Sequence, residues 1–137
     1  MSATRLTVLI VDDDRRNCEL LARLLEMEGC RVISALNVGE GLERASGARL
    51  DLVLLDVRMP GVGGLAACAS MRADPVLRSL PIYLVTAFDD SDVWPEAQAC
   101  GATGLLGKPY DRSALRRLVK ELWAAREAAS PRPLPEA

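Results

Sequence analysis

The sequence predicts an α/β domain in which five parallel strands alternate with five helices in a doubly wound arrangement. Two observations support this prediction. Short apolar runs rich in Val, Ile and Leu recur along the chain, as expected for strands buried on both faces of a parallel sheet. Longer segments with helical spacing separate these runs, and such alternation is typical of α/β folds. At 137 residues, the chain has the length of one domain.

The five predicted strands are the apolar runs themselves, at residues 6–11, 31–35, 50–55, 80–85 and 103–106. The first helix is expected to follow Asp14, whose side chain suits an N-cap, and to stop at Gly29. Its apolar face carries Cys18, Leu21, Leu24 and Leu25. The same spacing predicts helices over residues 38–45 and 65–71, and another around residues 115–122.

The connection over residues 89–100 is less regular. Pro95 would break the interior of a helix but fits its first turn, so this helix is expected to begin near Val93 or Trp94. Trp94 is either an exposed anchor for a partner or a partly buried residue that packs on its own domain. The final segment, SPRPLPEA at residues 130–137, carries three prolines and is expected to be an extended tail or the start of a linker. The predicted organisation is therefore one domain over residues 1–129 followed by this tail.

Composition excludes several classes of function. With 17 basic and 19 acidic residues, the chain has no global basic field to hold nucleic acid or an anionic membrane. It contains no histidine, which excludes Cys/His zinc sites and histidine-based acid–base catalysis. Its four cysteines lack CxxC spacing and are interpreted as reduced, mostly buried thiols. No segment resembles a signal peptide or a membrane span, so a soluble, cytoplasmic protein is expected.

Polar side chains follow four of the predicted strands. In chain order they are Asp12, Asp13 and Asp14, then Asp56, then Thr86, then Lys108. Taken singly, each has an ordinary explanation, such as a helix cap, a loop start, a strand residue or a surface charge. Ligands of open parallel sheets bind at the carboxyl ends of the strands, however. The combination therefore favours a pocket with several carboxylates, one hydroxyl and one ammonium group.

Carboxylates held close together need a compensating charge. Two unit charges about 5 Å apart repel by roughly 3 kcal/mol at an effective dielectric constant of about 20. Such a cluster either raises its pKa values or binds a cation. Mg²⁺ suits a few hard oxygen ligands, because it retains water molecules and accepts phosphate oxygens. One aspartate could then act as a nucleophile toward a phosphoryl group, with Lys108 paired to one phosphoryl oxygen and Thr86 donating to another.

Four segments carry a family resemblance: LIVDDD, DLVLLDVRMPGVGGL, PIYLVTA and GATGLLGKPY. In order and spacing they resemble the signature motifs of response-regulator receiver domains of two-component signalling, as in chemotaxis-type regulators. The resemblance covers residues 5 to 126, nearly all of the predicted domain. It implies a flavodoxin-like fold with strand order 2-1-3-4-5 and helices on both faces of the sheet.

The resemblance also implies a role for each site residue. Asp56 matches the phosphoacceptor, Thr86 the switch hydroxyl, and Lys108 the lysine that pairs with the phosphoryl group. The implied Mg²⁺ ligands are Asp12, Asp13, Asp56 and the backbone carbonyl of Arg58. Asp13 matches a direct ligand, whereas Asp12 is implied to act largely through metal-bound water.

Further positions concern the surroundings of the site. Gly61 and Ala87 match small positions that keep the pocket open, and the bond before Pro109 is usually cis in the family. Arg58 and Phe88 occupy variable positions, where they are predicted to influence the lifetime of the phosphoryl group. Leu105 stands where the family usually has a Tyr or Phe ring that reorients. We therefore hypothesise that output runs mainly through the loop after Thr86.

The leading hypothesis is a signalling module and not an enzyme, one that catalyses at most its own phosphorylation and dephosphorylation. It receives a phosphoryl group from a sensor histidine kinase or a histidine phosphotransfer protein. A surface near the fourth helix and fifth strand then meets a protein partner or output domain, without direct contact with nucleic acid or membrane; a homodimer stays open. The alternatives are a degenerate, unphosphorylated receiver that acts as a scaffold and a Mg²⁺-dependent aspartyl-phosphate hydrolase. The complete set of site residues disfavours the scaffold, and Arg58 stands where haloacid-dehalogenase-type hydrolases place an acid.

Overall fold

The computed structural model describes residues 5–47, 49–57, 63–75, 77–87, 94–108 and 111–129. It confirms the predicted doubly wound fold, with parallel strands in the order β2-β1-β3-β4-β5. The strands are β1 (Thr7–Val11), β2 (Arg31–Ala35), β3 (Leu52–Asp56), β4 (Ile82–Ala87) and β5 (Gly104–Lys108). The helices are α1 (Arg15–Met27), α2 (Val38–Gly47), α3 (Gly63–Ala73), α4 (Trp94–Ala99) and α5 (Arg112–Ala129).

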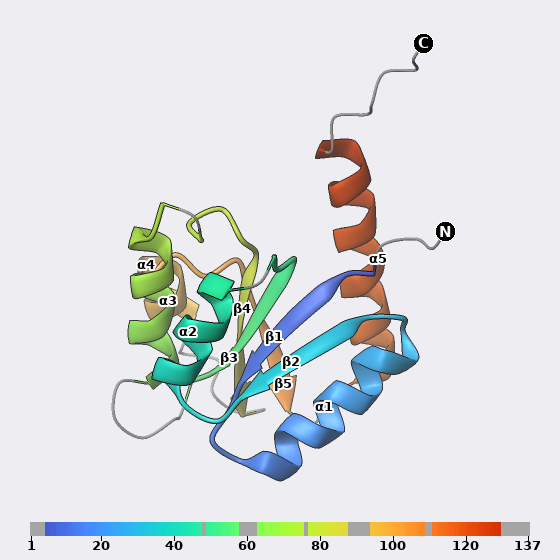
Figure 1. Cartoon of the computed structure of the whole chain (residues 1–137), viewed down its shortest axis with the longest axis horizontal. Helices are drawn as coiled ribbons and strands as arrows, with labels where there is room; N and C mark the ends of the chain where they lie inside the picture. The colour runs from blue at the N-terminus through green and yellow to red at the C-terminus, as the bar shows by residue number, and fades with distance from the viewer. Residues whose placement is uncertain are drawn as a thin grey trace.

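Helices cover both faces of the sheet (Figure 1). α1 and α5 pack on one face, and α2, α3 and α4 pack on the other. Because successive side chains of a strand point to opposite faces, the strands contribute to two separate apolar cores. In β1, Val8 and Ile10 face the α1–α5 side, whereas Leu9 and Val11 face the α2–α4 side. β3 lies in the middle of the sheet, and all of its residues are buried.

The strand boundaries differ from the predicted ones in a consistent direction. β3, β4 and β5 all begin and end later in the chain than predicted. Leu50 and Leu80 are apolar because they pack against the core on the α2–α4 side, outside the strands themselves. At the other end, backbone pairing continues through the polar residues Asp56, Thr86 and Lys108. The sheet therefore holds these three residues rigidly within its strands.

The end of α1 shows why a glycine stops this helix. Gly29 has a φ of +89°, a left-handed conformation that costs glycine little. Its N–H donates to the carbonyl of Glu26 at 2.9 Å, and the N–H of Cys30 donates to the carbonyl of Leu25 at 3.1 Å. This pair of bonds is a Schellman motif, which satisfies carbonyls at the end of the helix. The predicted stop is confirmed.

The irregular fourth connection contains α4, which begins at Trp94 as predicted and has Pro95 in its first turn. Trp94 is partly buried and packs against the core on the α2–α4 side. This contact favours the second of its two interpretations, a residue that packs on its own domain. No helix of the described segments is both long enough and apolar enough to cross a membrane.

Candidate functional site

The residues singled out in the sequence meet at one edge of the sheet, where the parallel strands end. Asp56 is the last residue of β3, and Lys108 is the last residue of β5. Thr86 lies near the end of β4, which runs between these two strands. Asp12 and Asp13 directly follow β1, the other neighbour of β3. Because the strands are parallel and paired in register, these ends lie side by side.

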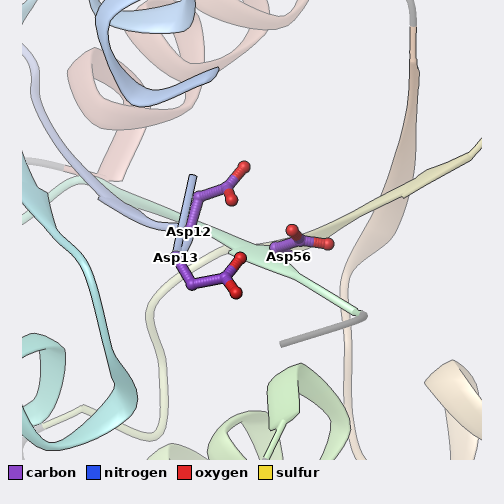
Figure 2. A group of neighbouring side chains, drawn as sticks. All are labelled: Asp12, Asp13 and Asp56. Atoms are coloured by element: carbon purple, nitrogen blue, oxygen red, sulfur yellow. The ribbon is translucent and has the colours of Figure 1, made fainter. Parts of the chain in front are cut away.

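Asp12, Asp13 and Asp56 form a cluster of carboxylates. One carboxylate oxygen from each residue lies within 4.8 Å of those of the other two. Figure 2 shows the three side chains grouped where β1 and β3 end. Asp12 and Asp56 are buried, with 3% and 7% of the residue exposed, whereas Asp13 is exposed. Solvent therefore screens the repulsion between the two buried groups only weakly.

Lys108 brings a positive charge to this cluster. Its Nζ atom lies 3.5 Å from Oδ2 of Asp56 and 3.8 Å from Oδ2 of Asp12. The Lys108 side chain is partly exposed, whereas the two carboxylates that it pairs with are buried. One ammonium group cannot neutralise three ionised carboxylates. The cluster must therefore either keep a proton or bind a cation.

The pKa of Asp12 reflects this excess of negative charge. It is raised from 3.8 to about 6. Burial is the largest cause, and the charge of Asp56 and a hydrogen bond with its side chain raise the pKa further. A hydrogen bond from the backbone of Asp14 and the charge of Lys108 act in the opposite direction. A buried carboxyl group that resists ionisation among hard oxygen donors fits a site for a divalent cation.

The start of α1 holds Asp12 in place. The backbone N–H of Asp14 donates to Oδ1 of Asp12 at 2.9 Å and so orients its carboxylate. The Asp14 side chain accepts hydrogen bonds from the backbone N–H groups of Arg16 and Asn17, which confirms it as the N-cap. Sequence reasoning identified Asp14 as a helix cap and as one of the strand-end carboxylates, but it missed the hydrogen bond from the Asp14 backbone to Asp12. A run of aspartates gives no sign of which backbone amide will bind which carboxylate.

The remaining predicted positions divide into described and undescribed ones. Thr86 is buried, with 5% of the residue exposed, on the strand between those that end in Asp56 and Lys108. Leu105 is partly buried and packs against the core on the α2–α4 side. The residues that lie outside the described segments are Arg58, Gly61, Phe88 and Pro109. Their roles stay predictions.

Comparison with known proteins places the chain in a family. The sequence pattern of the response regulator receiver domain matches residues 8–120, a stretch that contains the carboxylate cluster, Thr86 and Lys108. The chain belongs to this family. Receiver domains act in two-component signalling and are generally signalling modules and not catalysts. They pair with histidine kinases and output domains, and they typically bind Mg²⁺ at an acidic cluster.

Similar proteins show the settings in which this receiver domain type occurs. The chain is 39% identical over 123 residues to the sensor histidine kinase AruS of Pseudomonas aeruginosa. This match covers 88% of this chain but only 12% of AruS. It is 34% identical over 119 residues to Protein PilH of the same species, covering 85% of this chain and 97% of PilH. The solved structure of Vibrio cholerae chemotaxis protein CheY4 is 28% identical, with a TM-score of 0.81, and the match covers 87% of this chain and 99% of CheY4. A domain of this type can therefore be a small part of a protein or nearly all of it.

Proposed function

We propose that this receiver domain accepts a phosphoryl group on Asp56 from a phosphohistidine of a sensor histidine kinase or a histidine phosphotransfer protein. The supporting observation is the meeting of three carboxylates and one lysine at the strand ends. Among the carboxylates, Asp56 is the one that ends the buried central strand, and it lies 3.5 Å from Lys108. A nucleophilic oxygen is thus held beside a cation that can bind the incoming phosphoryl group.

In the same proposal, Asp12, Asp13, Asp56 and the backbone carbonyl of Arg58 hold Mg²⁺. The described donors fit this ion, because they are hard oxygens and few enough to leave room for water and a phosphoryl oxygen. When bound, Mg²⁺ neutralises the carboxylates and the charge on the transferring group. The raised pKa of Asp12 supports a cation here, whereas Arg58 enters through the family resemblance alone.

The proposed transfer makes one bond and breaks one. An Oδ atom of Asp56 attacks the phosphorus atom, the P–N bond of the donor breaks, and its electron pair stays on the imidazole nitrogen, which takes up a proton. Lys108 pairs with one phosphoryl oxygen, and the Thr86 hydroxyl donates to another. Water later hydrolyses the acyl phosphate and restores the Asp56 carboxylate. Its own phosphorylation and its own dephosphorylation are the only reactions that we propose the domain catalyses.

The phosphorylated domain then meets a downstream protein partner or an output domain in the cytoplasm. The balance of 17 basic and 19 acidic residues supports a protein partner over nucleic acid or an anionic membrane. In this proposal, residues 1–129 form the receiver domain and residues 130–137 a tail or linker. A second copy of the chain, which would give a homodimer, is another candidate partner in this proposal.

Phosphoramidate tests the proposal, because it is a small donor with a P–N bond. With Mg²⁺, we expect intact mass spectrometry to show one phosphoryl group added to the chain. Hydroxylamine, which cleaves acyl phosphates, should remove it, and chelation of Mg²⁺ by EDTA should prevent its formation. An adduct that resists hydroxylamine would contradict an aspartyl phosphate. If Mg²⁺ gave neither adduct nor released phosphate, the unphosphorylated scaffold would become the better explanation.

A further inference from the structure

Two of the four cysteines lie together. All four are free thiols and three are buried, as predicted. Cys68 belongs to α3, and Cys100 directly follows α4. The Sγ atom of Cys68 lies 3.5 Å from the backbone carbonyl oxygen of Cys100. The pKa of Cys68 is raised to about 12, with burial as the largest cause and a hydrogen bond to the Cys100 side chain as the next. The causes that raise the pKa values of Cys18 and Cys30 include no other thiol.

The two neighbouring thiols differ in their access to solvent. Cys68 is completely buried, whereas Cys100 is partly exposed. The Cys100 thiol now donates to the carbonyl of Ala97 at 3.2 Å. A dissolved oxidant therefore reaches Cys100 first, and Cys68 is placed to be the second thiol, which needs no access of its own.

Polar contacts already fasten α3 to the turn that carries Cys100. Arg72, one helical turn after Cys68, donates from Nε to the carbonyl of Gly101 at 2.7 Å. Its Nη2 atom donates to Oγ1 of Thr103 at 3.2 Å. These bonds hold α3 against the segment that follows Cys100, next to the thiol pair. A disulfide has a strict geometry, so it forms more readily between two segments that are already held close together.

We propose that a peroxide converts Cys68 and Cys100 into a reversible intramolecular disulfide. The Cys100 thiolate attacks hydrogen peroxide, its O–O bond breaks, and Cys100 becomes a sulfenic acid while hydroxide leaves. The Cys68 thiolate then attacks the Cys100 sulfur, so that the S–S bond forms, the S–O bond breaks and a second hydroxide leaves. With the two thiol protons, the products are one disulfide and two water molecules. Because burial raises the pKa of Cys68, the second step should be slow at neutral pH and faster as the pH rises.

The disulfide ties the end of α4 and the turn into β5 to α3. This turn precedes β5, whereas Lys108 is the last residue of β5. The cross-link therefore lies near the amino ends of the strands, and the carboxylate cluster lies at their carboxyl ends. Oxidation therefore restrains α4 and β5 without contact with Asp56. Formation of the bond does not depend on the proposed phosphorylation, and either proposal can fail without the other.

Counting free thiols tests the proposal. The whole chain is treated with hydrogen peroxide, denatured, alkylated with N-ethylmaleimide and weighed by intact mass spectrometry. The reduced protein carries four thiols, and the oxidised protein should take up two maleimide groups, with all four restored by dithiothreitol. Cys100→Ser should take up three with or without peroxide, because Cys68 then lacks its partner. The matched control Cys30→Ser should fall from three to one.

Peptide mapping and thermal unfolding complete the test. A peptide that joins Cys68 to Cys100 is expected, and the oxidised form should unfold at a Tm on the order of 10 °C higher than the reduced form. The rise follows because the bond closes a loop between residues 32 positions apart. Four maleimide groups after peroxide, irreversible oxidation of Cys100 alone, or a disulfide between two chains would each overturn the proposal. An unchanged Tm would overturn the restraint on α4 and β5.

Discussion

At the scale of single residues, the fold opposes the ionisation of Asp12. Its pKa is raised from 3.8 to about 6, mainly by burial. Between these values the folded, metal-free protein retains a proton that the unfolded chain releases. The free energy of unfolding should therefore decrease as the pH rises through this window. Mg²⁺ needs the ionised carboxylate, so the same proton competes with the metal.

Mg²⁺ affinity should consequently depend on pH. The apparent Kd is expected to rise about tenfold between pH 7 and pH 5, because one proton competes for a carboxyl group whose pKa is about 6. Isothermal titration calorimetry at constant ionic strength measures this change. Asp12→Asn should bind Mg²⁺ more weakly and lose most of the pH dependence. A wild-type Kd that stays constant over this range would contradict the role of Asp12.

Lys108 offers a second test of the electrostatics. Its charge lowers the pKa of Asp12, so Lys108→Ala should raise that pKa further. NMR titration of the Asp12 carboxyl carbon in metal-free protein measures the shift. Lys120→Ala, which removes an exposed lysine from α5, is the matched control and should leave the titration unchanged. Equal Asp12 titration curves in wild type and Lys108→Ala would show that the 3.8 Å ion pair does not form in solution.

The sequence could predict which residues meet at the site but not how they are held. Asp56, Thr86 and Lys108 are polar residues at the ends of apolar runs, and parallel strands bring such ends together. The hydrogen bond from the Asp14 backbone to Asp12 depends on the turn before α1, which no periodicity encodes. The pKa of Asp12 likewise depends on burial and on the position of Asp56. The roles of these residues stay proposals.

At the scale of elements, Gly29 tests the end of α1. Gly29→Ala should lower the free energy of unfolding by about 1 kcal/mol, because an L-residue resists the left-handed conformation. An added Cβ atom would meet nothing within 4 Å, so the cost is conformational and not steric. Gly39→Ala in α2 is the control, since its Cβ fits at an ordinary 3.5 Å, and its stability should be unchanged or slightly higher. Equal losses in urea unfolding would contradict the Schellman motif as the cause.

Element type was more predictable than element position. Apolar runs mark strands because their residues are buried on both faces, and this holds for all of β3. The same criterion placed the starts of β3 and β4 too early, because Leu50 and Leu80 are apolar through contacts outside the sheet. The sequence likewise left open whether Trp94 is an exposed partner anchor or packs on its own domain. Its packing against the α2–α4 core depends on how the chain folds back, which a single aromatic residue does not reveal.

At the scale of the whole molecule, stability depends on two cores that share one sheet. Leu54 lies in the central strand and is fully buried on the α1–α5 side. Leu54→Ala should lower the free energy of unfolding by about 2–5 kcal/mol, through lost burial and the cavity that remains. Leu20→Ala in α1 is the control, since half of Leu20 is exposed, and should change it by less than about 0.5 kcal/mol. Similar urea midpoints for the two variants would contradict the central position of β3.

The layering of the molecule follows from its sequence pattern, whereas the strand order does not. Alternation of strands and helices predicts a parallel sheet with helices on both faces. Periodicity alone cannot tell which strands are neighbours, and the order 2-1-3-4-5 came from the resemblance to receiver domains. That order puts β3 between β1 and β4 and so brings Asp12 and Asp13 to Asp56.

Phosphorylation of Asp56 is the central claim, and intact mass spectrometry after incubation with acetyl phosphate and Mg²⁺ tests it most directly. Wild type should gain one phosphoryl group. Asp14→Asn should gain it as well, because asparagine keeps both the N-cap and the backbone N–H that binds Asp12. Asp56→Asn should gain none and release no phosphate. An adduct of equal yield on Asp56→Asn would contradict Asp56 as the phosphoacceptor.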